Sequence, residues 1–262
     1  MFIPLRPTLR TALPGLLLAQ LLAMSCTQPP VESRAAAAAL RRPESVPDTA
    51  GYQRRAPRDP NGIGKYYMGR QIAHVMGHEG AGWLERADRQ QQEGTDVLLR
   101  ELQLKPDDVV ADIGAGTGYF SFRISALVPQ GRVLAVDIQP EMVEALSQKK
   151  TRLNAPNVEP VLGTTQNPNL PAGTVDLALI VDAYHEFDHP REMMRAIRQS
   201  LKPGGRVALV EYRAEDQKVP IKRIHRMSEE QARRELTALG FEFVRNNQAL
   251  PQQHLLIFRK PQ

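Results

Sequence analysis

The chain of 262 residues contains a single cysteine, Cys26, which excludes an internal disulfide, a cysteine-rich zinc module and a two-thiol redox centre. Aromatic residues make up only 5% of the sequence, which disfavours nucleic-acid recognition by stacking on bases. The net charge of +5 does not indicate a nucleic-acid-binding face either, because residues 1–60 hold eight arginines against four acidic residues and carry most of that charge. We therefore expect no nucleic-acid partner. With 42% hydrophobic and 24% charged residues, the chain has the proportions of a soluble globular protein.

The first 25 residues have the order typical of a secretory signal peptide. They hold Arg6 and Arg10, no acidic residue, and an apolar run from Leu13 to Met24. The stretch ending in Cys26 also resembles a bacterial lipoprotein signal, in which that cysteine would be lipidated and would anchor the protein. We therefore expect an exported protein, either periplasmic or a membrane-anchored lipoprotein, and the sequence leaves both open.

Residues 26–60 form a second segment with little to bury. They contain six prolines and a run of five alanines, with almost no large apolar residues. Such a composition is typical of a disordered tether.

Alternation of strands and helices starts near residue 107. A strand is predicted over residues 109–113, followed by the turn Gly114 to Gly118, a helix over residues 119–128, and a second strand from Arg132 that ends in Asp137. This is half of a nucleotide-binding βαβ unit, in which an acid at the tip of the second strand can accept both ribose hydroxyls. The G-x-G-x-G spacing differs from the G-x-G-x-x-G of dinucleotide folds, and this favours a ligand without a pyrophosphate.

The remaining sequence continues the same alternation. One helix is expected to begin at the cap Asp188 and to end at the turn Leu201 to Gly205, and a last helix is expected from the capping box at Ser228 to Leu239. Further strands are predicted at residues 157–162, 170–182, 206–212, 241–245 and 254–259.

Over residues 105–260 this pattern resembles the class I S-adenosylmethionine-dependent methyltransferases, on the strength of the first motif from Val110 to Gly118 and the L-K-P-G-G turn at Leu201. The resemblance implies an α/β fold with a Rossmann-like, doubly wound sheet of seven strands in the order 3-2-1-4-5-7-6. It also implies S-adenosyl-L-methionine as the cofactor. We expect a methyltransferase domain at residues 105–262 and an N-terminal helical lid at residues 61–104.

The resemblance also assigns roles in cofactor binding. Asp137 should hold the ribose hydroxyls, Ile138 should flank the adenine, and Asp112 should face the methionine amino group. Many relatives carry an acid after the third strand, where this chain has Thr164, which is then the candidate to accept a hydrogen bond from the adenine amino group. The cofactor-binding residues implied in this way are Asp112, Gly114, Gly116, Gly118, Asp137, Ile138, Thr164 and Asp182.

The acceptor of the methyl group is expected at the end of the fourth strand, because α/β folds bind substrates at the carboxyl edge of the sheet. His185 is the best candidate for a catalytic base, with Asp182 or Glu186 to orient it. The alternative is that His185 only caps or packs. The residues expected to shape the acceptor pocket are Tyr66, Tyr67, Arg70 and Tyr184.

No metal site is predicted from the sequence. His74 and His78 have a spacing that could share a helix face, and Glu79 stands beside them, but the pattern is not H-E-x-x-H and Gly77 and Gly80 weaken a helix there. The basic loop 213–226 could steer an anionic acceptor, although a solvated loop explains it as well.

Together these patterns predict a methyltransferase that uses S-adenosyl-L-methionine and acts on an undetermined small-molecule or protein acceptor. An oxygen or nitrogen nucleophile is expected rather than a thiol or arsenite, because the only cysteine lies in the leader. One alternative is a non-catalytic binding protein of the same fold, which export favours because the cofactor is made in the cytoplasm. The other is an NAD-dependent oxidoreductase, which the glycine spacing disfavours.

Overall fold

The structure, a computed structural model, describes residues 46–47 and 51–262. The predicted signal peptide at residues 1–25, Cys26 with its proposed lipid, and most of the predicted tether lie outside the described residues. None of the helices in the described part is long and apolar enough to cross a membrane. Residues 43–262 belong to one compact unit.

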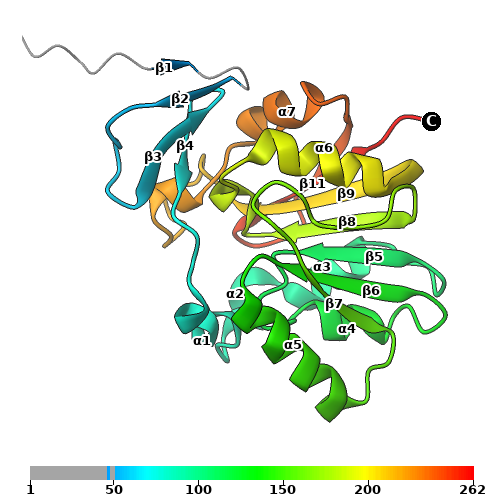
Figure 1. The fold of residues 1–262 in the computed structure, drawn as a ribbon. Helices are drawn as coiled ribbons and strands as arrows, with labels where there is room; N and C mark the ends of the chain where they lie inside the picture. The colour runs from blue at the N-terminus through cyan, green and yellow to red at the C-terminus, as the bar shows by residue number, and fades with distance from the viewer. Residues whose placement is uncertain (1–45, 48–50) are drawn as a thin grey trace, which may run out of the picture. The chain divides into compact units, whose positions relative to one another are not determined.

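The main sheet has seven strands, arranged spatially as β10-β11-β9-β8-β5-β6-β7 (Figure 1). When the seven strands are numbered in chain order and the sheet is followed from β7 to β10, the order is 3-2-1-4-5-7-6. The predicted topology is therefore confirmed. The five strands that come first along the chain, β5 to β9, run parallel, and β11 pairs antiparallel with both β9 and β10. Its strands are β5 (Val109–Ile113), β6 (Arg132–Asp137), β7 (Val158–Leu162), β8 (Val175–Val181), β9 (Leu201–Tyr212), β10 (Glu242–Asn247) and β11 (Gln253–Arg259).

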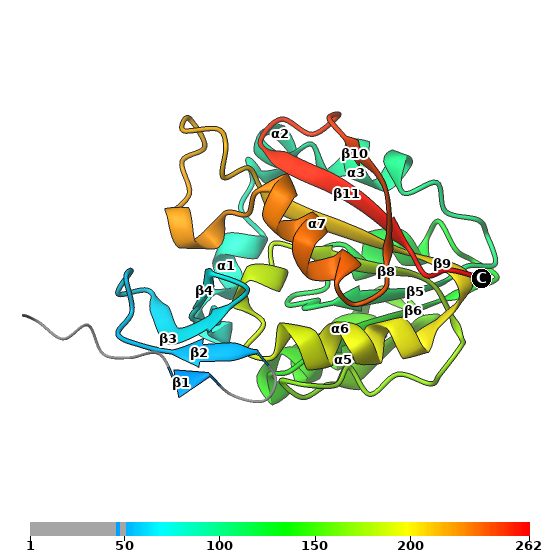
Figure 2. The ribbon, with the colours of Figure 1, turned by 90° about the horizontal axis from the view of Figure 1, so that it is seen from above.

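Helices cover both faces of this sheet (Figure 2). Alternate residues of β8 explain how one strand serves two cores: Leu177 and Leu179 pack in the cluster with the helices on one face, and Ala178 and Ile180 in the cluster on the other. One face is covered by α3 (Thr95–Glu101), α4 (Ser121–Ser125) and α5 (Pro140–Leu153), and the other by α6 (Pro190–Ser200) and α7 (Glu229–Thr237).

The helix caps agree with the sequence in one case of two. Ser228 Oγ accepts the backbone N–H of Gln231 at 3.2 Å and caps α7 as predicted. Asp188 does not cap α6, whose N-cap is His189 and has no side-chain bond. Asp188 instead accepts hydrogen bonds from Lys65 Nζ, at 2.6 Å through its carbonyl and 3.2 Å through its carboxylate. A buried cation from a distant strand thus outcompetes the local cap.

The segment before the main sheet differs most from expectation. It forms a second, four-stranded sheet of β1 (Val46–Pro47), β2 (Tyr52–Arg54), β3 (Gly62–Tyr67) and β4 (Arg70–Ala73). Short helices follow, namely η2 (His78–Gly80), α1 (Ala81–Leu84) and α2 (Arg89–Glu93). The predicted helical lid at residues 61–104 is therefore wrong for residues 62–73, and the predicted tether is wrong where β1 and β2 form.

The reason lies in a two-residue hairpin between β3 and β4. Met68 and Gly69 have φ angles of 46° and 91°, which is the backbone that a tight hairpin turn needs. Tyr67 pairs with Arg70 across this turn, and Tyr52 of β2 packs against Tyr67 with ring centroids 5.2 Å apart. Aromatic packing across the strands therefore stabilises a sheet rather than a helix in residues 62–73.

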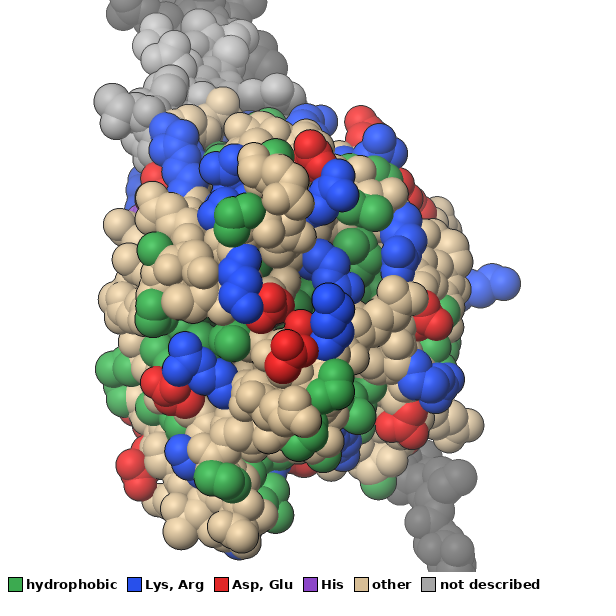
Figure 3. Space-filling model, turned by 90° about the vertical axis from the view of Figure 1, so that its right-hand side faces the viewer, with side chains coloured by type: hydrophobic (Ala, Val, Ile, Leu, Met, Phe, Trp, Pro, Cys, Tyr) green, Lys and Arg blue, Asp and Glu red, His purple; other side chains and the backbone are tan. Residues whose placement is uncertain are grey.

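The surface that faces the viewer in Figure 3 carries interspersed basic, acidic and apolar side chains. Basic side chains do not gather into a single-sign field on that face, which fits a chain whose described part has nearly balanced charge.

Candidate functional site

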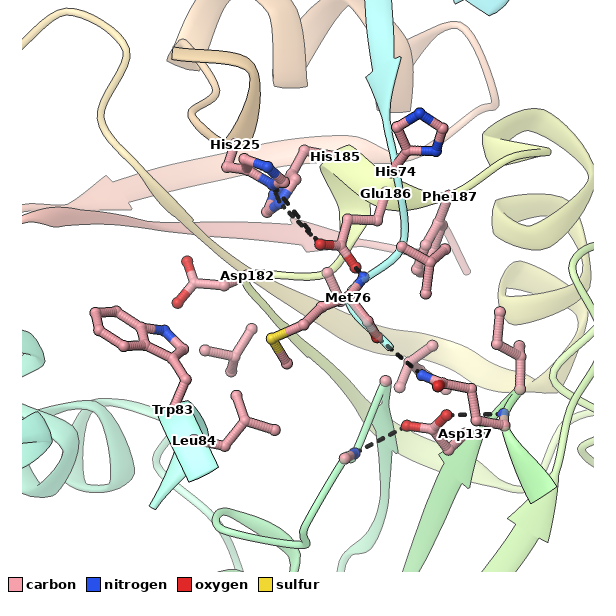
Figure 4. Close-up of a pocket in the computed structure, with 18 of the residues that line it drawn as sticks. His74, Met76, Trp83, Leu84, Asp137, Asp182, His185, Glu186, Phe187 and His225 are labelled. Atoms are coloured by element: carbon pink, nitrogen blue, oxygen red, sulfur yellow. Dashed lines mark hydrogen bonds and ion pairs between the residues drawn. The ribbon is translucent and has the colours of Figure 1, made fainter. Parts of the chain in front are cut away.

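A cavity of about 650 Å³ lies at the carboxyl ends of β5, β6 and β8, within the size range of small-molecule sites (Figure 4). This is the edge of the sheet at which the sequence places a ligand. Its wall includes the residues Met76, Trp83, Leu84, Gly114, Gly116, Asp137, Ile138, Gln139, Asp182, His185, Glu186 and His225.

The glycine turn forms one wall of this cavity. Gly114 and Gly116 line it and have φ angles of 76° and 54°, which an L side chain rarely adopts. A Cβ on Gly114 would lie 2.9 Å from the Cβ of Ala183, and one on Gly116 would lie 2.6 Å from Leu84 Cδ1. Gly118 does not line the cavity, because it packs against Leu146 and Phe122 behind the turn. The first two glycines thus open a cradle that larger residues would fill.

Asp137 lies at the tip of β6, beside the glycine turn (Figure 4). Its two oxygens accept backbone N–H groups of Gly116 and Gln139, both at 2.9 Å. Burial raises the pKa of this carboxyl, while the backbone donors oppose the shift. A carboxylate has about four acceptor positions, so Asp137 can still accept hydrogen bonds from two hydroxyls. Ile138 lines the cavity next to it.

Besides Gly118, two more of the predicted cofactor residues, Asp112 and Thr164, do not line the cavity. Asp112 is buried and accepts a hydrogen bond from Ser121 Oγ at 2.6 Å. Burial raises its pKa to about 6, against the opposing effect of that hydrogen bond. Thr164 Oγ1 accepts the N–H groups of Gln166 and Asn167 and closes a turn, while its neighbour Thr165 lines the cavity. The turn after β7 places Thr165, not Thr164, at the wall.

None of the four residues predicted to shape the acceptor pocket lines the cavity, and their side chains have other partners. Arg70 donates to both carboxylate oxygens of Glu235, at 2.8 and 2.9 Å, and Tyr184 donates to the same carboxylate at 2.8 Å. Tyr66 bonds Gln71 within its own hairpin, and Tyr67 packs on Tyr52. Glu235 is fully buried on α7, so these contacts join the small sheet to the main fold. A sequence pattern for helix α7 does not reveal this distant partner.

The opposite wall of the cavity holds a polar cluster around His185. Its Nδ1 lies 2.6 Å from Glu211 Oε2, and its Nε2 lies 3.1 Å from Nδ1 of His225. Glu186 Oε1 is 3.7 Å from both imidazoles. Sequence reasoning assigned the orientation of His185 to Asp182 or Glu186, whereas Glu211 makes the contact with Nδ1. The signal for Glu211 was present, since it is an acid at the end of the apolar run of β9.

The charged groups of this cluster shift one another's pKa values. Burial disfavours a charged His185, but the carboxylates of Glu211 and Glu186 outweigh it and raise its pKa to about 10. Burial and the charge of His185 lower the pKa of His225. A protonated His185 donates from both ring nitrogens and has no lone pair left, so it acts as a base only after losing that proton. Whether His185 serves as base stays a prediction.

Asp182 lies beside this cluster, at the end of β8. Its φ is 49°, and its Oδ2 accepts a hydrogen bond from Gln253 Nε2 at 2.7 Å. Burial raises the pKa of Asp182 well above its usual range, and the charges of Glu93 and Glu211 act in the same direction. Asp182 therefore offers the cavity wall a carboxyl that takes up a proton readily.

Residues 76–84 lie across the cavity between its two ends. The N–H of Met76 donates to Glu186 Oε2 at 3.1 Å, and its carbonyl accepts from Gln139 Nε2 at 3.0 Å. The N–H of His78 donates to Gln139 Oε1 at 2.8 Å. Among the described residues, no group of three metal-ligating side chains includes His74 or His78. Residues 76–84 therefore act as a cover over the cavity.

Comparison with known proteins gives three findings. Residues 110–205 match a family model described as a methyltransferase domain. An uncharacterized methyltransferase-like protein of Schizosaccharomyces pombe is 35% identical over 126 residues, which are 48% of this chain and 46% of that protein. A solved SAM-dependent methyltransferase from Aquifex aeolicus has a TM-score of 0.67 and 23% identity, covering 71% of this chain and 100% of that chain.

A further solved structure, the [4+2]-cyclase SpnF, has a TM-score of 0.57 and 18% identity, covering 68% of this chain and 83% of that chain. The chain therefore has the Rossmann-like, seven-stranded methyltransferase fold, and the sequence matches support a methyltransferase domain within it. The chain spans just under half the length of the curated relative from S. pombe.

Proposed function

We propose that this chain transfers a methyl group from S-adenosyl-L-methionine to an oxygen or nitrogen nucleophile of a small molecule or protein. The observation that carries the proposal is one cavity with two different ends. The glycine turn and Asp137 form one end, and His185, Glu186 and Asp182 lie at the other. The match of residues 110–205 to a methyltransferase domain supports it.

The residues of the first end fit the cofactor. Asp137 has acceptor positions left for the ribose hydroxyls, and Ile138 offers an apolar surface for the adenine. Gly114 and Gly116 leave room that a Cβ would take. When bound, the cofactor supplies a methyl group activated on a sulfonium.

The residues of the second end would align the acceptor. Methyl transfer is an in-line displacement, so the chain contributes mainly by holding the nucleophile in position and by keeping water out. Met76 and Leu84 cover the cavity with apolar groups. A proton leaving the acceptor would pass to the cluster of His185 and Glu186, with Glu211 fixing the imidazole.

Export remains part of the proposal. The leader at residues 1–25 and Cys26 support secretion or lipidation, in the periplasm or at a membrane. Mass spectrometry of the mature N-terminus tests this directly: a chain that begins at a lipidated Cys26 is expected for a lipoprotein. An intact N-terminus in cells that process other leaders would contradict export.

Calorimetric titration of the full chain with S-adenosyl-L-methionine, S-adenosylhomocysteine and NAD tests the cofactor. We expect binding of the first two and none of NAD. Binding of NAD alone would favour the oxidoreductase alternative. Cofactor binding without methyl transfer to any of a panel of hydroxyl and amine acceptors would favour the non-catalytic alternative.

A further inference from the structure

Three side chains with metal-ligating atoms converge at the acceptor end of the cavity (Figure 4). His185 and Glu186 lie in η3 (Tyr184–Glu186), which follows β8, and His225 ends η4 (Arg223–His225), which follows β9. Within residues 46–47 and 51–262, their ligand atoms lie within 4.8 Å of one another. The pairing of β8 with β9 brings the segments that carry these residues to the same edge of the sheet.

The triangle formed by these atoms has the size of a metal site. The nitrogen atoms His185 Nε2 and His225 Nδ1 are 3.1 Å apart, and each is 3.7 Å from Glu186 Oε1. In the plane of the three atoms, the point equidistant from them is about 2.0 Å from each. This distance matches the bond lengths of zinc to imidazole nitrogen and carboxylate oxygen. An ion can therefore bind all three without a backbone movement.

Two of the three side chains are held in place by further hydrogen-bond partners, as metal-ligating residues usually are. The fully buried Glu211 lies 2.6 Å from His185 Nδ1 and can hold a proton there, so an ion would replace only the proton on Nε2 and bind the Nε2 lone pair. The other oxygen of Glu186 accepts the N–H of Met76. Each of these contacts uses the atom that does not face the triangle.

We propose that His185, Glu186 and His225 bind one divalent transition-metal ion, with zinc as the best match to two imidazoles and a carboxylate. All three residues line the cavity, so a fourth coordination position faces the space in which an acceptor would lie. An oxygen donor of a bound molecule can complete the coordination there. The site goes beyond the proposed methyl transfer, and its occupancy can be measured without that activity. A bound ion would occupy the atoms of His185 and Glu186 that would otherwise take the acceptor's proton. It differs from the candidate considered from the sequence, which was His74, His78 and Glu79.

Metal binding by the full chain tests the proposal. The protein is purified without a histidine tag, stripped with EDTA, and titrated calorimetrically with Zn²⁺, and separately with Co²⁺ while visible absorption is recorded. We expect one ion per chain, and cobalt bands typical of four- or five-coordinate geometry. Absence of stoichiometric binding by the wild-type chain would overturn the proposal, because the two imidazoles would then merely share a proton.

Variants locate the ion. His225→Gln should lower zinc affinity by at least about 100-fold, and Glu211→Gln by about 10- to 100-fold through loss of His185 orientation. His78→Gln is the matched control, since His78 is half-exposed and outside the triangle, and it should bind as the wild type does. Unchanged affinity in His225→Gln would overturn the assignment, and Glu186→Gln gives the same test if that variant does not fold. Titration of the same samples with S-adenosyl-L-methionine reports on the cofactor end separately.

Discussion

The region of residues 105–262 and the region of residues 51–73 are specified in different ways. The first builds two cores from alternating strands and helices, most of which local sequence patterns predict. The second has a small cluster of its own, in which Tyr52, Tyr67 and Ile72 are buried. Its strongest contacts reach the first region, through Lys65 to Asp188 and through Arg70 to Glu235. A region with little core of its own is thus held by polar contacts to its neighbour.

The largest expected effect comes from breaking that connection. Glu235→Gln leaves the buried Arg70 guanidinium without its countercharge, which should lower the free energy of unfolding by about 3 to 5 kcal/mol. Urea unfolding measures this, with the exposed Glu230→Gln on the same helix as control. If stability is retained while affinity for an acceptor falls, Arg70 and Tyr184 belong to the acceptor pocket after all.

A pH-dependent effect is expected inside the first region. The pKa of Asp112 is about 6 in the folded chain and about 3.9 in an unfolded one, so the folded state binds this proton more tightly. Ionisation then destabilises the fold as pH rises from about 4 through 6, by up to about 2 to 3 kcal/mol. Asp112→Asn removes this term. The variant should gain stability relative to wild type between pH 4.5 and pH 8, measured by denaturant unfolding; a difference independent of pH would contradict the assignment.

The cofactor end offers a test of the sequence motif itself. Asp137→Ala should weaken binding of S-adenosyl-L-methionine by about 1 to 3 kcal/mol through the loss of charge-assisted hydrogen bonds. Calorimetry measures this, and the exposed Asp107→Ala before β5 should leave affinity unchanged. Equal affinities in wild type and Asp137→Ala would mean that the ribose lies elsewhere.

The smallest effect concerns the hairpin that sequence patterns missed. A Cβ on Gly69 would meet nothing within 4 Å, but its φ of 91° is unfavourable for alanine, so Gly69→Ala should cost about 1 kcal/mol of stability. Gly77 also has open space and a φ of −66°, so Gly77→Ala should be neutral or stabilise by about 0.4 to 1 kcal/mol. Thermal unfolding of both variants compares them. Equal effects would show that the turn is not held at positive φ.

Local sequence predicted the cofactor end well for a physical reason. Gly114, Gly116 and Asp137 lie within one βαβ unit, where turn geometry and strand alternation fix which residues reach the edge of the sheet. The same reasoning failed for Thr164, because a shift of one residue in a turn exchanges the wall residue for its neighbour. It also failed for residues 62–73, where the sequence predicts part of a helical lid and the chain forms two strands.

By itself, the sequence determined the alternation of strands and helices and the place of the glycine turn, because periodicity and turn chemistry act over a few residues. The order of the seven strands was implied by the family resemblance. Only the tertiary structure decided the partners of His185. Glu211 and His225 lie 26 and 40 residues away along the chain, and they meet His185 because β8 and β9 pair side by side. Tertiary packing likewise took Arg70 and Tyr184 away from the cavity, since a buried Glu235 offers them a charge partner that no local pattern announces.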